Sequence, residues 1–161
     1  MLEWVGFKGD RTEGLKLLYE AAETDTARTL FSKWFPMAYH YIFQFQFGTV
    51  GERDGMSLVQ TNIHLQQTTE MFPNGVLIRF NQGKRCQIEG RIDEAIQYFT
   101  PNEIGWTNFH HFCYWDLFWS YGIDGRFAEA AQYADKLYME SVWSPSIYSW
   151  LQATVLVCLL I

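Results

Sequence analysis

The chain has 161 residues, a formal net charge of −6 and an aromatic content of 18%. This acidic balance, without any basic cluster, argues against direct binding of nucleic acid. The cysteines Cys86, Cys113 and Cys158 form no CxxC pair, which argues against a disulfide framework or a zinc knuckle and indicates reduced thiols in a cytosolic setting. The opening residues Met1–Trp4 lack the basic start and long apolar core of a signal peptide.

Apolar residues recur with helical spacing along the chain, and glycine or proline separates the segments. The pattern predicts an all-α protein. In chain order, the expected helices cover residues 13–23, 26–47, 57–72, 76–87, a short helix that follows Gly90 and ends at about Thr100, then 104–122, 126–140 and 147–161.

The segment 26–47 is apolar nearly all round, which predicts a buried helix. Pro36 should kink or restart this helix, because proline removes a helical hydrogen bond. Residues 43–47 alternate like a strand, but their place among helices favours helix. A membrane-surface segment is the competing interpretation, although too few basic residues, Lys33 among them, accompany it for the usual amphipathic anchor.

The next helix has a clear start and a clear end in the sequence. Ser57 to Gln60 fits a capping box, in which both side chains satisfy free backbone donors. Val59 and Ile63 predict a narrow apolar stripe, and Pro73 should end the helix.

One stretch occurs twice. Residues 90–98 read GRIDEAIQY, and 35 residues later 125–133 read GRFAEAAQY, with six of nine positions identical. A self-match at this period indicates a helical-repeat array, since a tetratricopeptide unit is about 34 residues long. Each glycine should end a helix in a left-handed conformation. Two unrelated helix starts that look alike are the alternative.

The repeat predicts specific packing within each helix pair. Ala95 and Ala130 should be almost fully buried, because small residues belong where two helices come closest. Ala95 should meet Gly83, and at the position that matches Gly83 the Phe118 ring should find room beside Ala130.

We therefore expect a right-handed solenoid of antiparallel helix pairs. Its units are roughly 1–24 (partial), 26–72 (degenerate), 74–101, 104–141 and 144–161 (partial), which suggests a fragment of a longer chain. The last segment is apolar, but it has fewer than the about 20 residues of a membrane span. It is better interpreted as the first helix of a further repeat.

Four motifs resemble a known family, the tetratricopeptide repeat protein 39 family with its Iml2-like relatives. The motifs are Gly6–Arg11 with Gly14 and Leu15, Phe72–Gly75, His110–Leu117, and Glu140–Ser144 with Tyr148 and Leu151. The resemblance implies an intracellular, non-enzymatic repeat scaffold without catalytic residues, related to fungal proteins tied to inclusion-body clearance and described as outer-membrane proteins. The chain departs from the family pattern at Pro101 and at Gln44 and Gln46.

The one tempting ligand cluster is His110, His111 and Cys113. His110 and Cys113 share a helical face, whereas His111 points elsewhere, and Cys86 or His40 would have to complete a site with enough ligands for zinc. Packed aromatic-like histidines are the simpler interpretation. The sequence contains no GxSxG elbow, phosphate-binding loop or HExxH motif. We therefore expect that the protein is not an enzyme and that it binds no metal ion and no cofactor.

A recognition groove is the more informative hypothesis. The repeat register places one set of side chains on the groove side of the helices that begin adjacent units: Phe80, Asn81, Lys84, Trp115, Asp116 and Trp119. Tryptophans stand where the familiar clamp for acidic chaperone tails has polar or basic residues, which favours an apolar or aromatic-anchored peptide. Lys84 and Asp116 should orient that peptide. The alternative is that the neighbouring unit buries both tryptophans.

Two functions follow from these expectations. The first is a cytoplasmic scaffold or adaptor that binds a protein or peptide partner. The second is a peripheral membrane or lipid-droplet-associated protein of inclusion-body clearance, on a lipid droplet or the mitochondrial outer membrane, which would use the aromatic segment 34–47 or the apolar helix 147–161.

Overall fold

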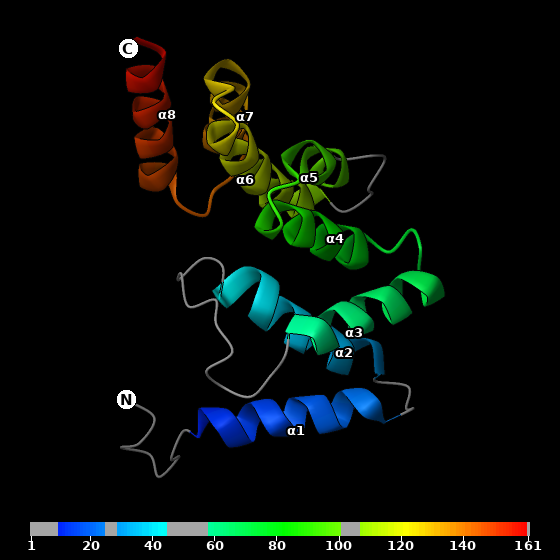
Figure 1. Ribbon diagram of the computed structural model, residues 1–161. Helices are drawn as coiled ribbons and strands as arrows, with labels where there is room; N and C mark the ends of the chain where they lie inside the picture. The colour runs from blue at the N-terminus through cyan, green and yellow to red at the C-terminus, as the bar shows by residue number, and fades with distance from the viewer. Residues whose placement is uncertain (1–9, 25–28, 45–57, 101–106, 161) are drawn as a thin grey trace, which may run out of the picture. The chain divides into compact units, whose positions relative to one another are not determined.

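The computed structural model describes residues 10–24, 29–44, 58–100 and 107–160, and every regular element in these ranges is a helix (Figure 1). The predicted all-α class is confirmed. The chain divides into two compact units, residues 1–81 and 82–161, which are described in turn. The repeat boundaries expected from the sequence stay a prediction.

The first unit contains α1 (Arg11–Glu23), α2 (Thr29–Ala38), the π-helix η2 (Tyr39–Gln44) and α3 (Leu58–Met71). Asp10 caps α1, because its side chain accepts a hydrogen bond from the Glu13 N–H at 3.0 Å. Hydrogen bonds between side chains join α1 to α3, with the Tyr19 and Thr61 hydroxyls 2.7 Å apart.

The expectation of a buried apolar stripe on α3 is wrong. Val59 and Ile63 are exposed, and the helix instead buries a largely polar face, made of Thr61, His64, Leu65 and Thr68. Most polar side-chain atoms of this face find partners, whereas the buried His64 Nδ1 has no hydrogen-bond partner among the described residues. The Thr68 hydroxyl donates to the His64 carbonyl at 2.8 Å, and His64 Nε2 lies 3.2 Å from a Glu23 carboxylate oxygen of α1.

The helix around Pro36 also differs in part from the expectation. Helix α2 runs through Pro36 and changes at Tyr39 to the π-helix η2. Pro36, Met37 and Ala38 are buried, but Phe31 is 60% exposed and Phe35 lies on the same exposed face. The segment is therefore amphipathic rather than buried all round. Residues 26–28 and 45–47 of the expected helix, and Ser57 of the expected capping box, lie outside the described residues.

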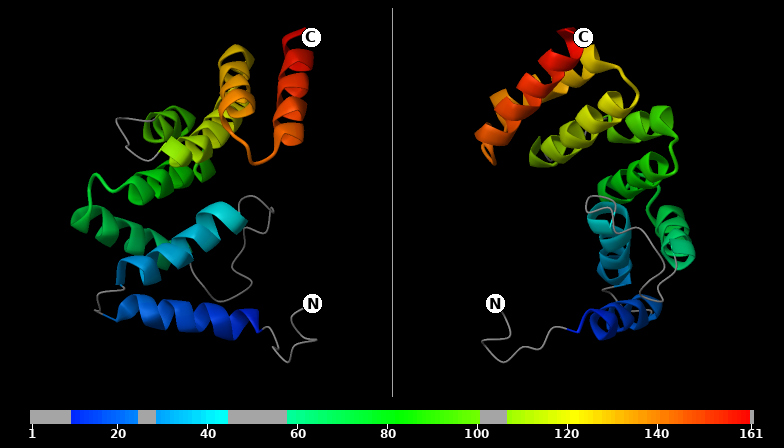
Figure 2. Two further views of the ribbon diagram at one scale, coloured as in Figure 1. Left: turned by 180° about the vertical axis from the view of Figure 1, so that it is seen from behind. Right: turned by 60° about the vertical axis from the view of Figure 1, so that its left-hand side comes forward.

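The second unit contains the end of α4 (Val76–Ile88), then α5 (Ile92–Phe99), α6 (Thr107–Ile123), α7 (Phe127–Glu140) and α8 (Pro145–Leu160). Helices α6, α7 and α8 lie side by side in all views (Figures 1 and 2). Their shared core consists of Phe118, Ala130, Ala134, Leu137, Tyr148, Leu151 and Val155.

The duplicated stretch forms the same turn twice. Gly90 has a φ of 73° and Gly125 a φ of 75°. The N–H of Arg91 donates to the Cys86 carbonyl at 2.9 Å, and the N–H of Arg126 donates to the Tyr121 carbonyl at 2.9 Å. Each turn is a Schellman motif, in which the left-handed glycine lets the helix carbonyls find donors. The repeat inferred from the sequence is thus present in the backbone.

Ala95 and Ala130 are both 0% exposed, as predicted. The atoms nearest to a Cβ built on Gly83 belong to Phe99, and the expected contact of Ala95 with Gly83 stays a prediction. A Cβ placed on Gly83 would lie 2.6 Å from a ring carbon of Phe99, so Gly83 makes room for that ring of α5. Phe118 does lie in one cluster with Ala130 and Ala134, as the register predicts.

Helix α8 resembles α6 in sequence and in burial. A shift of 34 residues, the length of a tetratricopeptide unit, carries Tyr114 and Leu117 of α6 onto Tyr148 and Leu151 of α8. Leu117 and Leu151 are both 0% exposed, so the two helices turn equivalent faces toward the interior. Among the described helices, none is both long enough and apolar enough to cross a membrane.

Candidate partner-binding surface

The six candidate groove residues lie on two helices, as predicted, but with different exposure. Phe80 and Asn81 on α4 belong to the first unit, and both are buried. Lys84, also on α4, and Asp116 on α6 belong to the second unit and are buried as well, whereas the Trp115 and Trp119 side chains of α6 are half-buried. The tryptophans are therefore the members of the set that remain partly accessible.

Lys84 and Asp116 form a buried ion pair between α4 and α6. Lys84 Nζ also donates to the Gln87 side chain at 3.3 Å, and Gln87 Nε2 donates to the Ser120 hydroxyl at 3.1 Å. Burial raises the pKa of the Asp116 carboxyl, although the Lys84 ammonium opposes part of the rise. The expectation that these two charges orient a bound peptide is therefore revised, because the fold already uses each to compensate the other.

Asn81 satisfies its donor within its own helix, since Nδ2 donates to the Leu77 carbonyl at 2.7 Å. Its amide oxygen has no hydrogen-bond partner in the part of the chain that the structure describes. Because the residue is fully buried, it supports α4 from inside the first unit rather than presenting a polar group at the surface.

Trp115 and Trp119 form one aromatic group on α6. Their ring centroids are 5.9 Å apart at 69°, and Trp119 also meets Phe118 edge-on at 5.1 Å. Both tryptophans pack against the core shared by α6, α7 and α8. Within the described residues, nothing accepts a hydrogen bond from the buried Trp119 Nε1. Each ring is thus held by the core on one side while part of it stays open.

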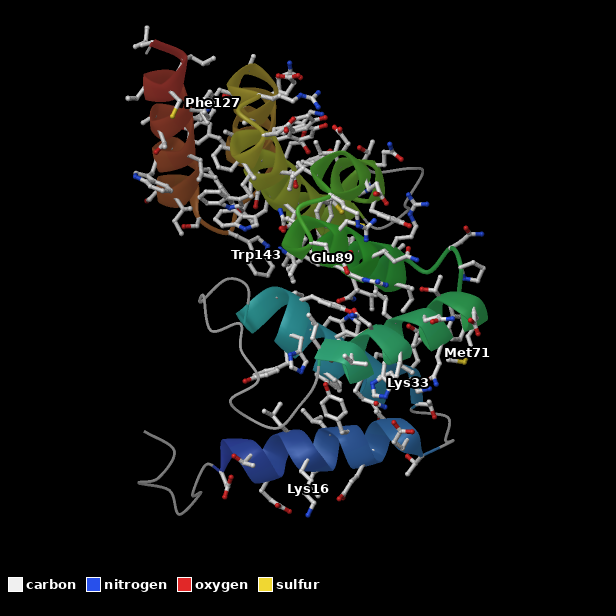
Figure 3. The ribbon with its side chains drawn as sticks, in the orientation of Figure 1. Lys16, Lys33, Met71, Glu89, Phe127 and Trp143 are labelled. Atoms are coloured by element: carbon white, nitrogen blue, oxygen red, sulfur yellow. The ribbon has the colours of Figure 1, made fainter. Side chains whose placement is uncertain are left out.

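Helix α8 presents exposed apolar residues that the sequence analysis did not single out. Ile147 is 45% exposed and Trp150 is 57% exposed. Gln152, on the opposite flank of α8, donates to Asp135 of α7 at 2.7 Å. Trp143, labelled in Figure 3 between α7 and α8, meets Phe112 of α6 at 5.6 Å. The signal in the sequence was a helix of 16 residues without a charge.

The surface of α6 and α7 on the side of Tyr121 and Tyr133 is closed by its own contacts. The two rings stack at 5.6 Å with an interplanar angle of 11°. The Arg126 guanidinium lies 4.5 Å from the Tyr121 centroid, and Lys136 Nζ lies 5.0 Å from that of Tyr133. These cation–π contacts occupy the faces of the rings.

The histidines of α6 pack among aromatic rings. His110 and His111 each lie 6.2 Å from the Tyr114 ring, and Cys113 is buried. His111 Nε2 approaches a Glu140 carboxylate oxygen at 4.0 Å. Across the described ranges, no three His, Cys, Asp or Glu side chains are grouped so as to hold a metal ion.

Comparisons with known proteins agree with the repeat architecture. The model of the family described as Iml2/Tetratricopeptide repeat protein 39 matches residues 1–160. The protein named Tetratricopeptide repeat protein ttc-39B, from Caenorhabditis elegans, is 33% identical over 155 residues, which cover 94% of this chain and 26% of the relative. The chain thus spans about a quarter of the length of that curated relative. No solved structure matches it significantly.

Proposed function

Because the chain belongs to the Iml2/Tetratricopeptide repeat protein 39 family, we propose that it is a non-enzymatic protein-interaction scaffold that holds a segment of a partner protein. Tetratricopeptide arrays stack helix pairs into extended surfaces on which partners bind. The proposed anchors are Trp115 and Trp119.

The observation that carries this proposal is the half-burial of these two rings on a packed core. Tryptophan combines a large apolar area with one hydrogen-bond donor and is enriched among residues that dominate binding energy. A ring that the core already holds loses little conformational freedom on binding, so less of the binding energy is spent on ordering it.

The buried members of the set support the anchors. The ion pair of Lys84 with Asp116, and the hydrogen bond from Gln87 to Ser120, join α4 to α6 one helical turn apart. Asp116 lies next to Trp115 in the sequence, so this connection fixes the part of α6 that carries the tryptophans.

The experiment compares partner capture with stability. Trp115→Ala and Trp119→Ala should lose a partner that the wild-type chain captures from lysate, while helicity stays close to wild type. Trp115→Leu and Trp119→Phe keep much of the packing and separate lost binding from lost fold. Met139→Ala, which removes an exposed apolar side chain of α7, is the matched control. Undiminished capture by both alanine variants would contradict the proposal.

A second candidate function is peripheral attachment to an organelle surface, such as a lipid droplet or the mitochondrial outer membrane. It is favoured by the exposed apolar residues of the uncharged helix α8, among them Trp150 and Leu160. Tryptophan suits a membrane interface, but the basic residues that usually accompany such a helix are missing from α8. Flotation with liposomes in the absence of any partner protein separates the two functions, since only a lipid-binding chain floats by itself. For the scaffold we propose a cytoplasmic location.

A further inference from the structure

Equivalent positions of the successive repeats carry opposite chemistry. A shift of 35 residues carries Lys84 of α4 onto Trp119 of α6, and a shift of 34 carries Asp116 of α6 onto Trp150 of α8. The repeat therefore replaces the buried ion pair between α4 and α6 with two indoles, one on α6 and one on α8.

The second polar bridge between α4 and α6 also has no counterpart. Gln87 and Ser120, which share a hydrogen bond of 3.1 Å, correspond to Gly122 and Thr154. Gly122 has no side chain to offer, and no neighbouring atom lies within 4 Å of a Cβ built there. The hydrogen bond that joins α4 to α6 therefore has no equivalent between Gly122 of α6 and Thr154 of α8.

Equivalent residues of α6 and α8 also differ in solvent exposure. Asp116 and Cys113 are buried on α6, whereas their counterparts on α8, Trp150 and Ile147, are 57% and 45% exposed. Tyr148 and Leu151 turn one face of α8 into the core. Ile147 and Trp150 lie on the flank away from Gln152, whose amide bonds to α7.

The Gln152 bond to Asp135 leaves Ile147 and Trp150 on the flank of α8 away from α7. In the loop before α8, the Trp143 ring contacts Phe112 of α6. Trp115 and Trp119 pack against the core to which Tyr148 and Leu151 contribute. The four residues Trp115, Trp119, Ile147 and Trp150 are hereafter called the α6–α8 aromatic surface.

The charge of this surface restricts what can bind it. Helix α8 has no charged residue, and α6 has one aspartate, Asp116, which is already paired with Lys84. A carboxylate or an ammonium brought onto the indoles would lose water without gaining a counter-charge, which is costly. Apolar side chains lose no such hydration and bury indole area instead.

We propose that the partner segment binds across α6 and α8, on the α6–α8 aromatic surface, through uncharged apolar side chains. This inference rests on the proposed scaffold function and adds Ile147, Trp150 and the apolar chemistry of the partner to it.

The test uses the full chain and a synthetic probe. The probe is a short, end-capped, fluorescein-labelled peptide with three leucines on one helical face and alanine, glutamine and serine elsewhere. Two matched probes carry glutamate or lysine in place of the central leucine. Fluorescence anisotropy should show binding of the leucine probe and at least about tenfold weaker binding of both charged probes. Trp150→Ser should weaken the leucine probe at least about tenfold, in line with a hot-spot residue, whereas the control Met139→Ser should not.

The outcomes separate this inference from the scaffold proposal. If Trp119→Phe or Trp115→Leu weakens binding and Trp150→Ser does not, the scaffold survives but the inference about α8 is overturned. If the charged probes bind as tightly as the leucine probe, the claim that the partner binds through uncharged apolar side chains is overturned. Displacement of the probe by neutral phosphatidylcholine vesicles would assign the surface to lipid and overturn the inference. A wild-type chain that is a dimer, together with a Trp150→Ser variant that is a monomer, would assign the surface to a second copy and also overturn it. Circular dichroism of each variant confirms that the fold is kept.

Discussion

Gly83 of α4 lies against the Phe99 ring of α5, so closely that a Cβ on Gly83 would come within 2.6 Å of it. In the next repeat, a shift of 35 residues carries this pair onto Phe118 of α6 and Ala134 of α7, which share one core cluster. The large residue has thus moved from the second helix of the pair to the first. Each repeat keeps one ring between its two helices, as close packing at a constant spacing requires.

Substitution of Gly83 tests this contact. Gly83→Ala should destabilise the chain, because overpacking costs roughly 1–3 kcal/mol and exceeds the gain of about 0.5–1 kcal/mol from replacing a helical glycine. Gly122→Ala is the control, since nothing lies within 4 Å of the added Cβ and the same helical gain applies. Urea denaturation gives both values. In Gly83→Ala combined with Phe99→Leu, the cost should be less than the sum of the single costs, and simple additivity would contradict the direct contact.

The two repeated turns make a second prediction. Gly90→Ala and Gly125→Ala should each cost about 1–2 kcal/mol, because a residue with a Cβ is strained in the left-handed conformation that both glycines adopt. The two costs should be similar, since the turns share their φ angles and hydrogen bonds. Gly14→Ala in α1, where φ is not left-handed and the space is open, should be stabilising. Clearly different costs at Gly90 and Gly125 in denaturant titrations would mean that the turns are not equivalent.

The helices and the repeat were predictable from local signals. Gly90 and Gly125 marked the turns, and Pro73 marked the end of α3. These residues act through backbone conformation, which depends little on distant parts of the chain.

Side-chain environments were harder to predict, because they depend on partners from other helices. Lys84 and Asp116 were expected as surface charges, yet each lies inside because the other compensates it. His64 is buried on α3 against Glu23 of α1, which no periodicity of α3 could reveal. Trp150 was missed for the converse reason, since an apolar residue in an apolar helix gives no sign of whether a neighbour covers it.

The Lys84–Asp116 pair leads to a third prediction. Asp116→Leu should cost about 3–5 kcal/mol, because it leaves a buried ammonium without a partner. The double variant Lys84→Met/Asp116→Leu should recover most of that loss, since apolar residues of similar volume can replace a buried ion pair at little or no cost. The double-mutant cycle, measured by chemical denaturation, therefore gives a large coupling energy. Independent, additive losses would show that the pair does not act as a unit.

The same carboxyl predicts how stability depends on pH. Burial raises the pKa of Asp116 in the folded chain above its value in the unfolded chain, so the folded state binds the proton more tightly. The contribution of this group to stability is therefore fully present below the unfolded pKa and is lost as the pH rises through the folded pKa. The double variant Lys84→Met/Asp116→Leu lacks the group, so across this acidic window its stability should fall less with rising pH than that of the wild type. Melting temperatures measured in steps through the window check this. Parallel profiles for the two proteins would show that Asp116 ionises equally readily in the folded and unfolded states.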